Sequence, residues 1–90
     1  MNEVLRGGRL GGHDPSELAE RFGTPFYAYD LDVVTRQVEA LRSILPSSFD
    51  LAYAVKANPN RAVLRQLSGL SLGADVASGG ELRHALRAGF

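Results

Sequence analysis

Lys56 is the only lysine in this 90-residue chain, whose other basic residues are arginines and two histidines. It lies in an otherwise apolar stretch, LAYAVKANPN at residues 51–60. A guanidinium stays protonated and is a poor nucleophile, whereas an amine that loses hydration in apolar surroundings can present its free form to a carbonyl. This position therefore suits Schiff-base chemistry. The alternative is a structural lysine, whose stem covers apolar surface while its ammonium stays in water.

Asp75 is the second candidate, on a strand predicted over residues 72–77. Alternation with period two places Asp75 on one face with Gly73 and Ala77. On the strand predicted over residues 51–56, it places Lys56 on one face with Ala52 and Ala54. These small side chains leave room for a ligand beside the amine. We expect Asp75 to be an inward carboxylate next to Lys56. The alternative is a solvent-exposed carboxylate at the start of a helix.

Ser78 and Glu81 have the S-x-x-E spacing of a helix capping box, with two glycines between them. We predict that both cap a helix, and the functional alternative is a glycine turn whose amides face an anion. His13 and His84 are isolated from residues at metal-ligand spacing, so no metal site is expected. The three tyrosines are expected to be packing residues.

Three helices are predicted around the two strands. The first covers residues 31–45, is capped by Asp30 or Asp32, and stops at Pro46; its apolar stripe consists of Leu31, Val34, Val38, Leu41 and Leu45. The second follows Asn58 or Asn60 as its cap, with Pro59 in its first turn and an inner face of Val63, Leu67 and Leu70. The third follows Ser78, ends at Gly89, and has on one side Leu82, Ala85 and Leu86.

The order strand, helix, strand, helix is typical of a parallel sheet with right-handed crossovers. Two such units cannot cover both faces of a sheet. We therefore expect an incomplete α/β domain, the opening βα units of a (β/α)8 TIM-type barrel, which takes about 250 residues. In this scheme residues 31–90 begin the barrel.

Residues 1–30 form a separate N-terminal segment in this interpretation. Glycines in residues 1–12 indicate turns or a short edge strand. Asp14 and the proline after it predict the start of a helix that ends at Gly23. Residues 24–30, TPFYAYD, predict a short aromatic strand.

Composition excludes several classes of function. With ten acidic and ten basic residues and no cluster of basic ones, neither nucleic acid nor a membrane surface is an expected partner. Cysteine is absent, which excludes disulfides and thiolate metal sites. Residues 1–12 lack the apolar run of a signal peptide, and no stretch approaches the roughly 18 apolar residues of a membrane span, so we expect a cytoplasmic protein.

Three motifs in this order resemble those of a known family. They are TPFYAYD at residues 24–30, YAVKAN at residues 53–58 and GADVASGGEL at residues 73–82. Together they are similar to the amino-terminal part of the diaminopimelate decarboxylases. This group belongs to the barrel-fold (fold type III) decarboxylases that use pyridoxal phosphate, with ornithine and arginine decarboxylases as relatives.

The resemblance implies that Lys56 forms a Schiff base with pyridoxal 5'-phosphate at the end of the first barrel strand. It places Ala54 beside the cofactor ring, and it places Asp75 near Lys56 and the cofactor in a polar cluster. Glu81 is added to this cluster, in competition with its predicted role in the helix cap. In the implied reaction the amino-acid substrate displaces Lys56, the pyridinium ring takes up the electrons left by departing carbon dioxide, and the freed Lys56 acts as a proton carrier.

The implied substrate is meso-diaminopimelate, converted to L-lysine in lysine biosynthesis. Alternatives within the family act on ornithine, arginine, carboxynorspermidine or carrier-linked amino acids. Alanine racemase is disfavoured, because its lysine motif continues with Ala-Tyr-Gly where this chain has Pro59-Asn60. An alternative of another class is a non-catalytic homologue that binds pyridoxal phosphate or only a partner protein.

The resemblance also implies a homodimer whose active site takes residues from both subunits. Residues 1–30 would pack on a C-terminal β-domain outside this chain. The phosphate-binding loop, the acidic partner of the pyridine nitrogen and the arginine for the substrate carboxylate belong to later sequence. We therefore expect the 90 residues alone to be inactive.

Overall fold

The computed structural model describes residues 5–90, and the chain divides into two compact units, residues 1–33 and 34–90. Each unit is described by itself. Among the described residues, the helices are too short or too polar to cross a membrane.

The first unit contains a small hairpin and one helix. Strands β1 (Leu5–Arg6) and β2 (Arg9–Leu10) pair antiparallel around Gly7 and Gly8. Both glycines have positive φ angles, of 58° and 74°, as a tight two-residue hairpin turn requires. The prediction of turns or a short edge strand is confirmed for residues 5–12, and its remainder, residues 1–4, lies outside the described part.

Helix α1 (Pro15–Phe22) begins where the sequence predicts. The Asp14 carboxylate accepts a hydrogen bond from the Ser16 backbone N–H at 2.9 Å, which satisfies one of the free donors of the first turn. Gly23, with a φ of 78°, ends the helix.

The aromatic strand predicted over residues 24–30 is wrong, because the structure assigns no strand there. A strand exists only where a neighbour pairs with its backbone, and the sheets of the described residues are β1–β2 and β3–β4. The aromatic composition indicated a strand, but it does not supply the neighbouring strand, and Tyr27 is 90% exposed.

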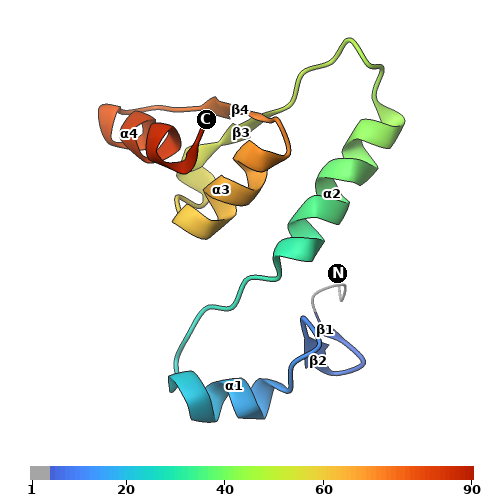
Figure 1. The fold of residues 1–90 in the computed structure, drawn as a ribbon, viewed down its shortest axis with the longest axis vertical. Helices are drawn as coiled ribbons and strands as arrows, with labels where there is room; N and C mark the ends of the chain where they lie inside the picture. Colours follow the sequence, from blue (N-terminus) through green and yellow to red (C-terminus); the bar gives the residue numbers. More distant parts are fainter. Residues whose placement is uncertain (1–4) are drawn as a thin grey trace. The chain divides into compact units, whose positions relative to one another are not determined.

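The second unit has the predicted strand and helix order. Strand β3 (Ala52–Ala54) leads through a short 3-10 helix, η1 (Val55–Ala57), into helix α3 (Arg61–Gly69). Strand β4 (Gly73–Asp75) then leads into helix α4 (Gly79–Ala88). The strands β3 and β4 pair in parallel, with α3 and α4 packed together beside them (Figure 1). The predicted α/β class with parallel strands is confirmed, although both strands are shorter than expected.

The core of the second unit lies between the sheet and its two helices. It consists of buried side chains from η1, α3 and α4, with partly buried residues of both strands packed against it: Val55, Leu64, Ala85 and Ala88, then Tyr53, Ala74, Val76 and Phe90. Val55 is fully buried and Leu64 is 1% exposed. The helices thus cover one face of the β3–β4 sheet.

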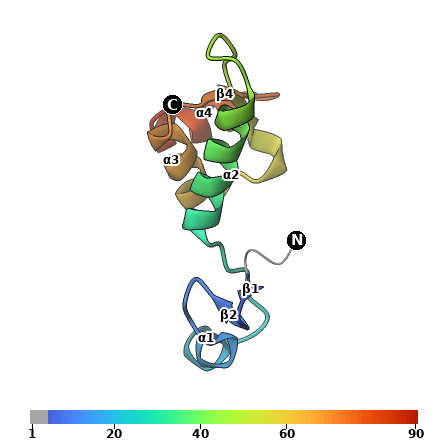
Figure 2. The same cartoon turned by 90° about the vertical axis from the view of Figure 1, so that its right-hand side faces the viewer.

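Helix α2 (Leu31–Ile44) begins in the first unit, where the Asp30 carboxylate accepts a hydrogen bond from the Asp32 N–H at 3.0 Å. Within the second unit, Gln66 of α3 donates to the Thr35 hydroxyl of α2 at 2.7 Å, and Figure 2 shows α2 beside α3. Of the predicted apolar stripe, Val38 is buried, whereas Leu41 is exposed.

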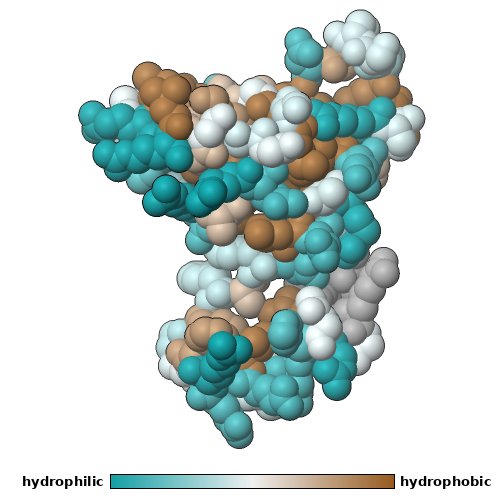
Figure 3. Space-filling model, in the orientation of Figure 1, coloured by the Kyte–Doolittle hydropathy of each residue, from teal (hydrophilic) through white to brown (hydrophobic). Residues whose placement is uncertain are grey.

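The predicted apolar side of α4 is only partly buried. Ala85 and Ala88 enter the core, whereas Leu82 and Leu86 are 48% and 60% exposed. Figure 3 shows brown, hydrophobic surface at the end of the second unit formed by α4.

Candidate functional site

Lys56 lies just beyond the strand in which the sequence places it. Strand β3 ends at Ala54, and residues 55–57 form the 3-10 helix η1. Alternation of faces therefore stops at Ala54, so the prediction that Lys56 continues the alanine face of the strand is wrong in this detail. Val55, the first residue of this turn, enters the core, and short 3-10 helices commonly make such connections. The Lys56 side chain is exposed.

Hydrogen bonds close the turn that carries Lys56. The Tyr53 hydroxyl donates to the backbone carbonyl of Asn58 at 3.1 Å. The Asn58 side-chain oxygen accepts from the Asn60 N–H at 3.0 Å. Asn60 in turn caps α3 by accepting from the backbone N–H groups of Ala62 and Val63. The predicted asparagine cap is confirmed as Asn60, whereas Pro59 lies before the helix and not in its first turn.

The tyrosine hydrogen bond is the feature that sequence reasoning missed. Tyr53 was expected to be a packing residue, and its ring does pack against the core. A signal for the second role is the spacing of five residues, because a tyrosine near the end of a strand can reach forward over the following turn only if that turn is short.

The parallel register brings Asp75 beside the lysine strand. Ala52 pairs with Gly73 and Ala54 pairs with Asp75. A Cβ atom placed on Gly73 would lie 3.9 Å from the Ala52 Cβ, so these positions share one face. Asp75 lies two residues farther along β4 on that face and is exposed. The result is a sheet face of small residues with one carboxylate, next to the turn that carries the amine.

Glu81 makes its capping contacts. The Ser78 hydroxyl accepts from the Glu81 N–H at 3.1 Å, and the Glu81 carboxylate accepts from the Ala77 N–H at 3.0 Å. The Glu81 carboxylate thus bonds to Ala77, the residue before the cap Ser78, and not to Ser78 itself.

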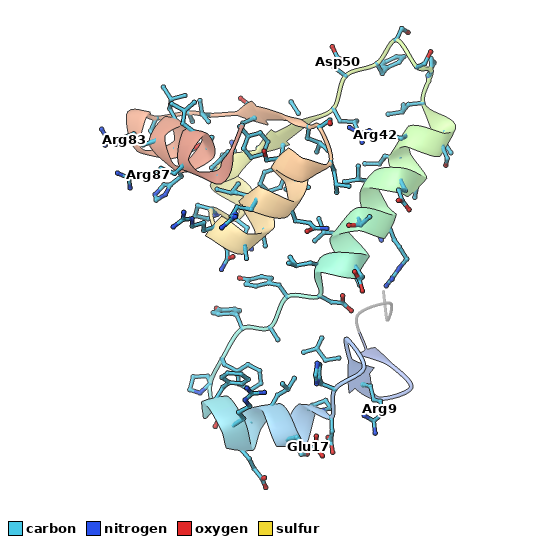
Figure 4. The ribbon with its side chains drawn as sticks, in the orientation of Figure 1. Arg9, Glu17, Arg42, Asp50, Arg83 and Arg87 are labelled. Atoms are coloured by element: carbon cyan, nitrogen blue, oxygen red, sulfur yellow. The ribbon has the colours of Figure 1, made fainter. Side chains whose placement is uncertain are left out.

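In Figure 4, Arg83 and Arg87 of the same helix extend away from the β3–β4 sheet, so they do not line the small-residue face.

Comparison with known proteins identifies the family. Residues 31–90 match the family described as "Pyridoxal-dependent decarboxylase, pyridoxal binding domain". This match covers most of the chain, and the chain therefore belongs to this family of pyridoxal-binding domains.

Two similar relatives carry the same name. The chain is 45% identical to the diaminopimelate decarboxylase of Aquifex aeolicus over 90% of its length, and 44% identical to that of Methanocaldococcus jannaschii over 81%. It covers 19% and 18% of these two relatives, so it spans about a fifth of their length. The resemblance seen in the three motifs is confirmed.

Two solved structures share the fold. The crystal structure of AQ1208 from Aquifex aeolicus superposes with a TM-score of 0.83 at 43% identity, covering 90% of this chain and 20% of that one. Diaminopimelate decarboxylase from M. jannaschii, in co-complex with L-lysine, superposes with a TM-score of 0.77 at 38% identity, covering 93% and 21%. The parallel strands and helices therefore match the N-terminal part of a decarboxylase barrel domain.

The residues present fit pyridoxal phosphate, the cofactor of this family. Its aldehyde requires an accessible amine, and Lys56 is exposed. Its flat ring requires neighbours with little bulk, and the adjacent sheet face carries Ala52, Ala54 and Gly73. Asp75 adds one exposed carboxylate to this face.

Proposed function

We propose that the protein carrying this chain is a pyridoxal-phosphate-dependent decarboxylase that converts meso-diaminopimelate to L-lysine. The observation that supports this proposal most is the exposed Lys56 on the turn after β3, beside the small-residue face of the sheet. Membership in the pyridoxal-binding family and 45% identity to a diaminopimelate decarboxylase favour the same chemistry.

In this proposal Lys56 holds the cofactor by condensation of its amine with the cofactor aldehyde. Bound pyridoxal phosphate supplies an electron sink for the pair left when carbon dioxide departs. With the substrate amine bound in its place, Lys56 would act as an acid, and its ammonium would donate a proton to the carbon that has lost carbon dioxide. Ala54 leaves space for the ring next to this amine.

Asp75 is proposed to orient the cofactor or to hold a proton together with Lys56. The strand register supports this role, because it places Asp75 beside Ala54. Glu81 is the less favoured member of the proposed cluster, since its carboxylate already accepts a hydrogen bond from Ala77.

Alternatives differ in substrate or in catalytic competence. Other decarboxylases of this fold would use ornithine, arginine, carboxynorspermidine or a carrier-linked amino acid, and a non-catalytic homologue would bind the cofactor without turnover. The names of the similar proteins favour diaminopimelate, and one of them was solved with L-lysine.

The test is a substrate comparison with the full-length protein. We expect carbon dioxide release from meso-diaminopimelate, with a kcat/KM at least about 100-fold above those for ornithine and arginine, because a polar site rejects analogues that leave its groups unpaired. Preference for another amino acid would overturn the substrate, and cofactor binding without turnover would support the non-catalytic alternative.

We further propose that the full-length protein is a cytoplasmic homodimer. Residues 1–30 would form an N-terminal segment that packs on a C-terminal β-domain, and residues 31–90 would begin the barrel. The exposure of Phe22, Phe26 and Tyr27 favours a packing partner for the N-terminal segment. Sedimentation of the full-length protein as a monomer would contradict the dimer.

A further inference from the structure

The turn that carries Lys56 has little packing of its own. Val55 is fully buried, but the two residues after it, Lys56 and Ala57, are exposed. A 3-10 helix of three residues also has poorer hydrogen-bond geometry than an α-helix. The position of the Lys56 amine therefore depends on what holds Asn58, the residue at which the turn ends.

Tyr53 of strand β3 holds Asn58 through a hydrogen bond. Its ring packs against the core cluster, and its hydroxyl crosses the whole of η1 to reach the Asn58 carbonyl at 3.1 Å. This hydrogen bond is partly buried, so water competes with it less than at an open surface. Through Asn58 and Asn60, the same connection continues into the cap of α3.

We propose that Tyr53 is a positioning residue, whose hydroxyl fixes the Lys56 turn in the conformation that receives the cofactor. This inference rests on the proposed role of Lys56. A turn that samples several conformations binds its ligand more weakly than a fixed one. The apparent dissociation constant rises as the fraction of molecules in the binding conformation falls. The tyrosine hydroxyl therefore acts on cofactor affinity without touching the cofactor.

The test compares Tyr53→Phe with Tyr27→Phe in the full-length protein. Tyr53→Phe keeps the packed ring and removes only the hydroxyl. Tyr27→Phe removes the same atom from a side chain that is 90% exposed in the first unit. Two quantities are measured: amide hydrogen exchange of residues 55–58 in the cofactor-free protein, and the dissociation constant of pyridoxal phosphate from its visible absorbance.

In Tyr53→Phe we expect faster exchange confined to residues 55–58 and a dissociation constant raised about 2- to 10-fold, the range for the loss of one neutral hydrogen bond. Tyr27→Phe is expected to change neither quantity. Unchanged exchange and affinity in Tyr53→Phe would overturn the inference. So would a general rise in exchange across α3 and α4, which would indicate only lost stability.

Failure of the proposed function is distinguishable from failure of this inference. If the unaltered protein forms no adduct between pyridoxal phosphate and Lys56, the proposed function is wrong. If the adduct forms and Tyr53→Phe binds the cofactor as tightly as the unaltered protein does, only the role of Tyr53 is wrong.

Discussion

Lys56 combines an accessible side chain with a turn that is held at both ends. The side chain is exposed, while the residue before it is fully buried and the residue two places after it accepts the Tyr53 hydrogen bond. An amine anchored in this way can meet a cofactor at a fixed position, which is the main requirement for covalent catalysis by positioning.

Replacement of Lys56 by arginine in the full-length protein keeps the positive charge and removes the nucleophilic amine. We expect decarboxylation to fall by at least about 100-fold, the lower end of what a positioned acid–base group contributes. Arg65→Lys is a matched control, because it adds an amine at an exposed position of α3 and is expected to leave the rate unchanged. Activity of Lys56→Arg equal to that of the control would disprove the catalytic role.

The sequence singled out residues with reactive side chains, but not their local geometry. The register pairs Asp75 with Ala54, whereas Lys56 lies in the turn beyond β3, so the predicted proximity of Lys56 and Asp75 stays a prediction. The 3-10 helix was missed, because period-two alternation contains no information on where a strand ends. The hydroxyl of Tyr53 was missed for the same reason, since its partner lies across that turn.

Among the elements, α4 depends on its cap, because its first turn begins with two glycines, which favour helix poorly. Ser78→Ala is expected to lower the free energy of unfolding of the full-length protein by about 1 kcal/mol through loss of the bond to the Glu81 N–H. Ser78→Asp restores an acceptor and is expected to regain most of this loss. Equal stability of Ser78→Ala and the unaltered protein in urea would rule out the cap.

The core of the second unit depends on Leu64, which is 1% exposed in the same cluster as Val55. Leu64→Ala is expected to cost about 2–5 kcal/mol of stability, the usual cost of a cavity at a buried leucine. Arg65→Ala, at the next and exposed position of α3, is expected to stay within about 0.5 kcal/mol. Chemical denaturation of both variants measures the difference, and similar losses would contradict the assigned core.

Helix boundaries were predicted better than burial. Asp14, Asn60 and Ser78 cap their helices as the sequence indicates, because capping depends on residues a few positions apart. The aromatic strand over residues 24–30 was wrong and the face of α4 was only partly right, because both depend on neighbours that local spacing does not specify.

At the scale of the whole molecule, the chain spans about a fifth of the length of its relatives. We expect a purified protein of residues 1–90 to release no carbon dioxide from meso-diaminopimelate above the uncatalysed rate. The physical reason is that one sheet face next to Lys56 is open, so water is not excluded from the reacting groups. Addition of pyridoxal phosphate is the control, and turnover by this chain would show that it needs no further residues.

The central claim is that Lys56 holds the cofactor. Borohydride reduction of the full-length protein loaded with pyridoxal phosphate, followed by peptide mapping, tests it most directly, because reduction fixes a Schiff base where it stands. We expect a pyridoxyl group on Lys56, in the peptide that begins at Ser43 and ends at Arg61 after cleavage at arginine. A pyridoxyl group on a different lysine, or no adduct on protein that binds the cofactor, would contradict it.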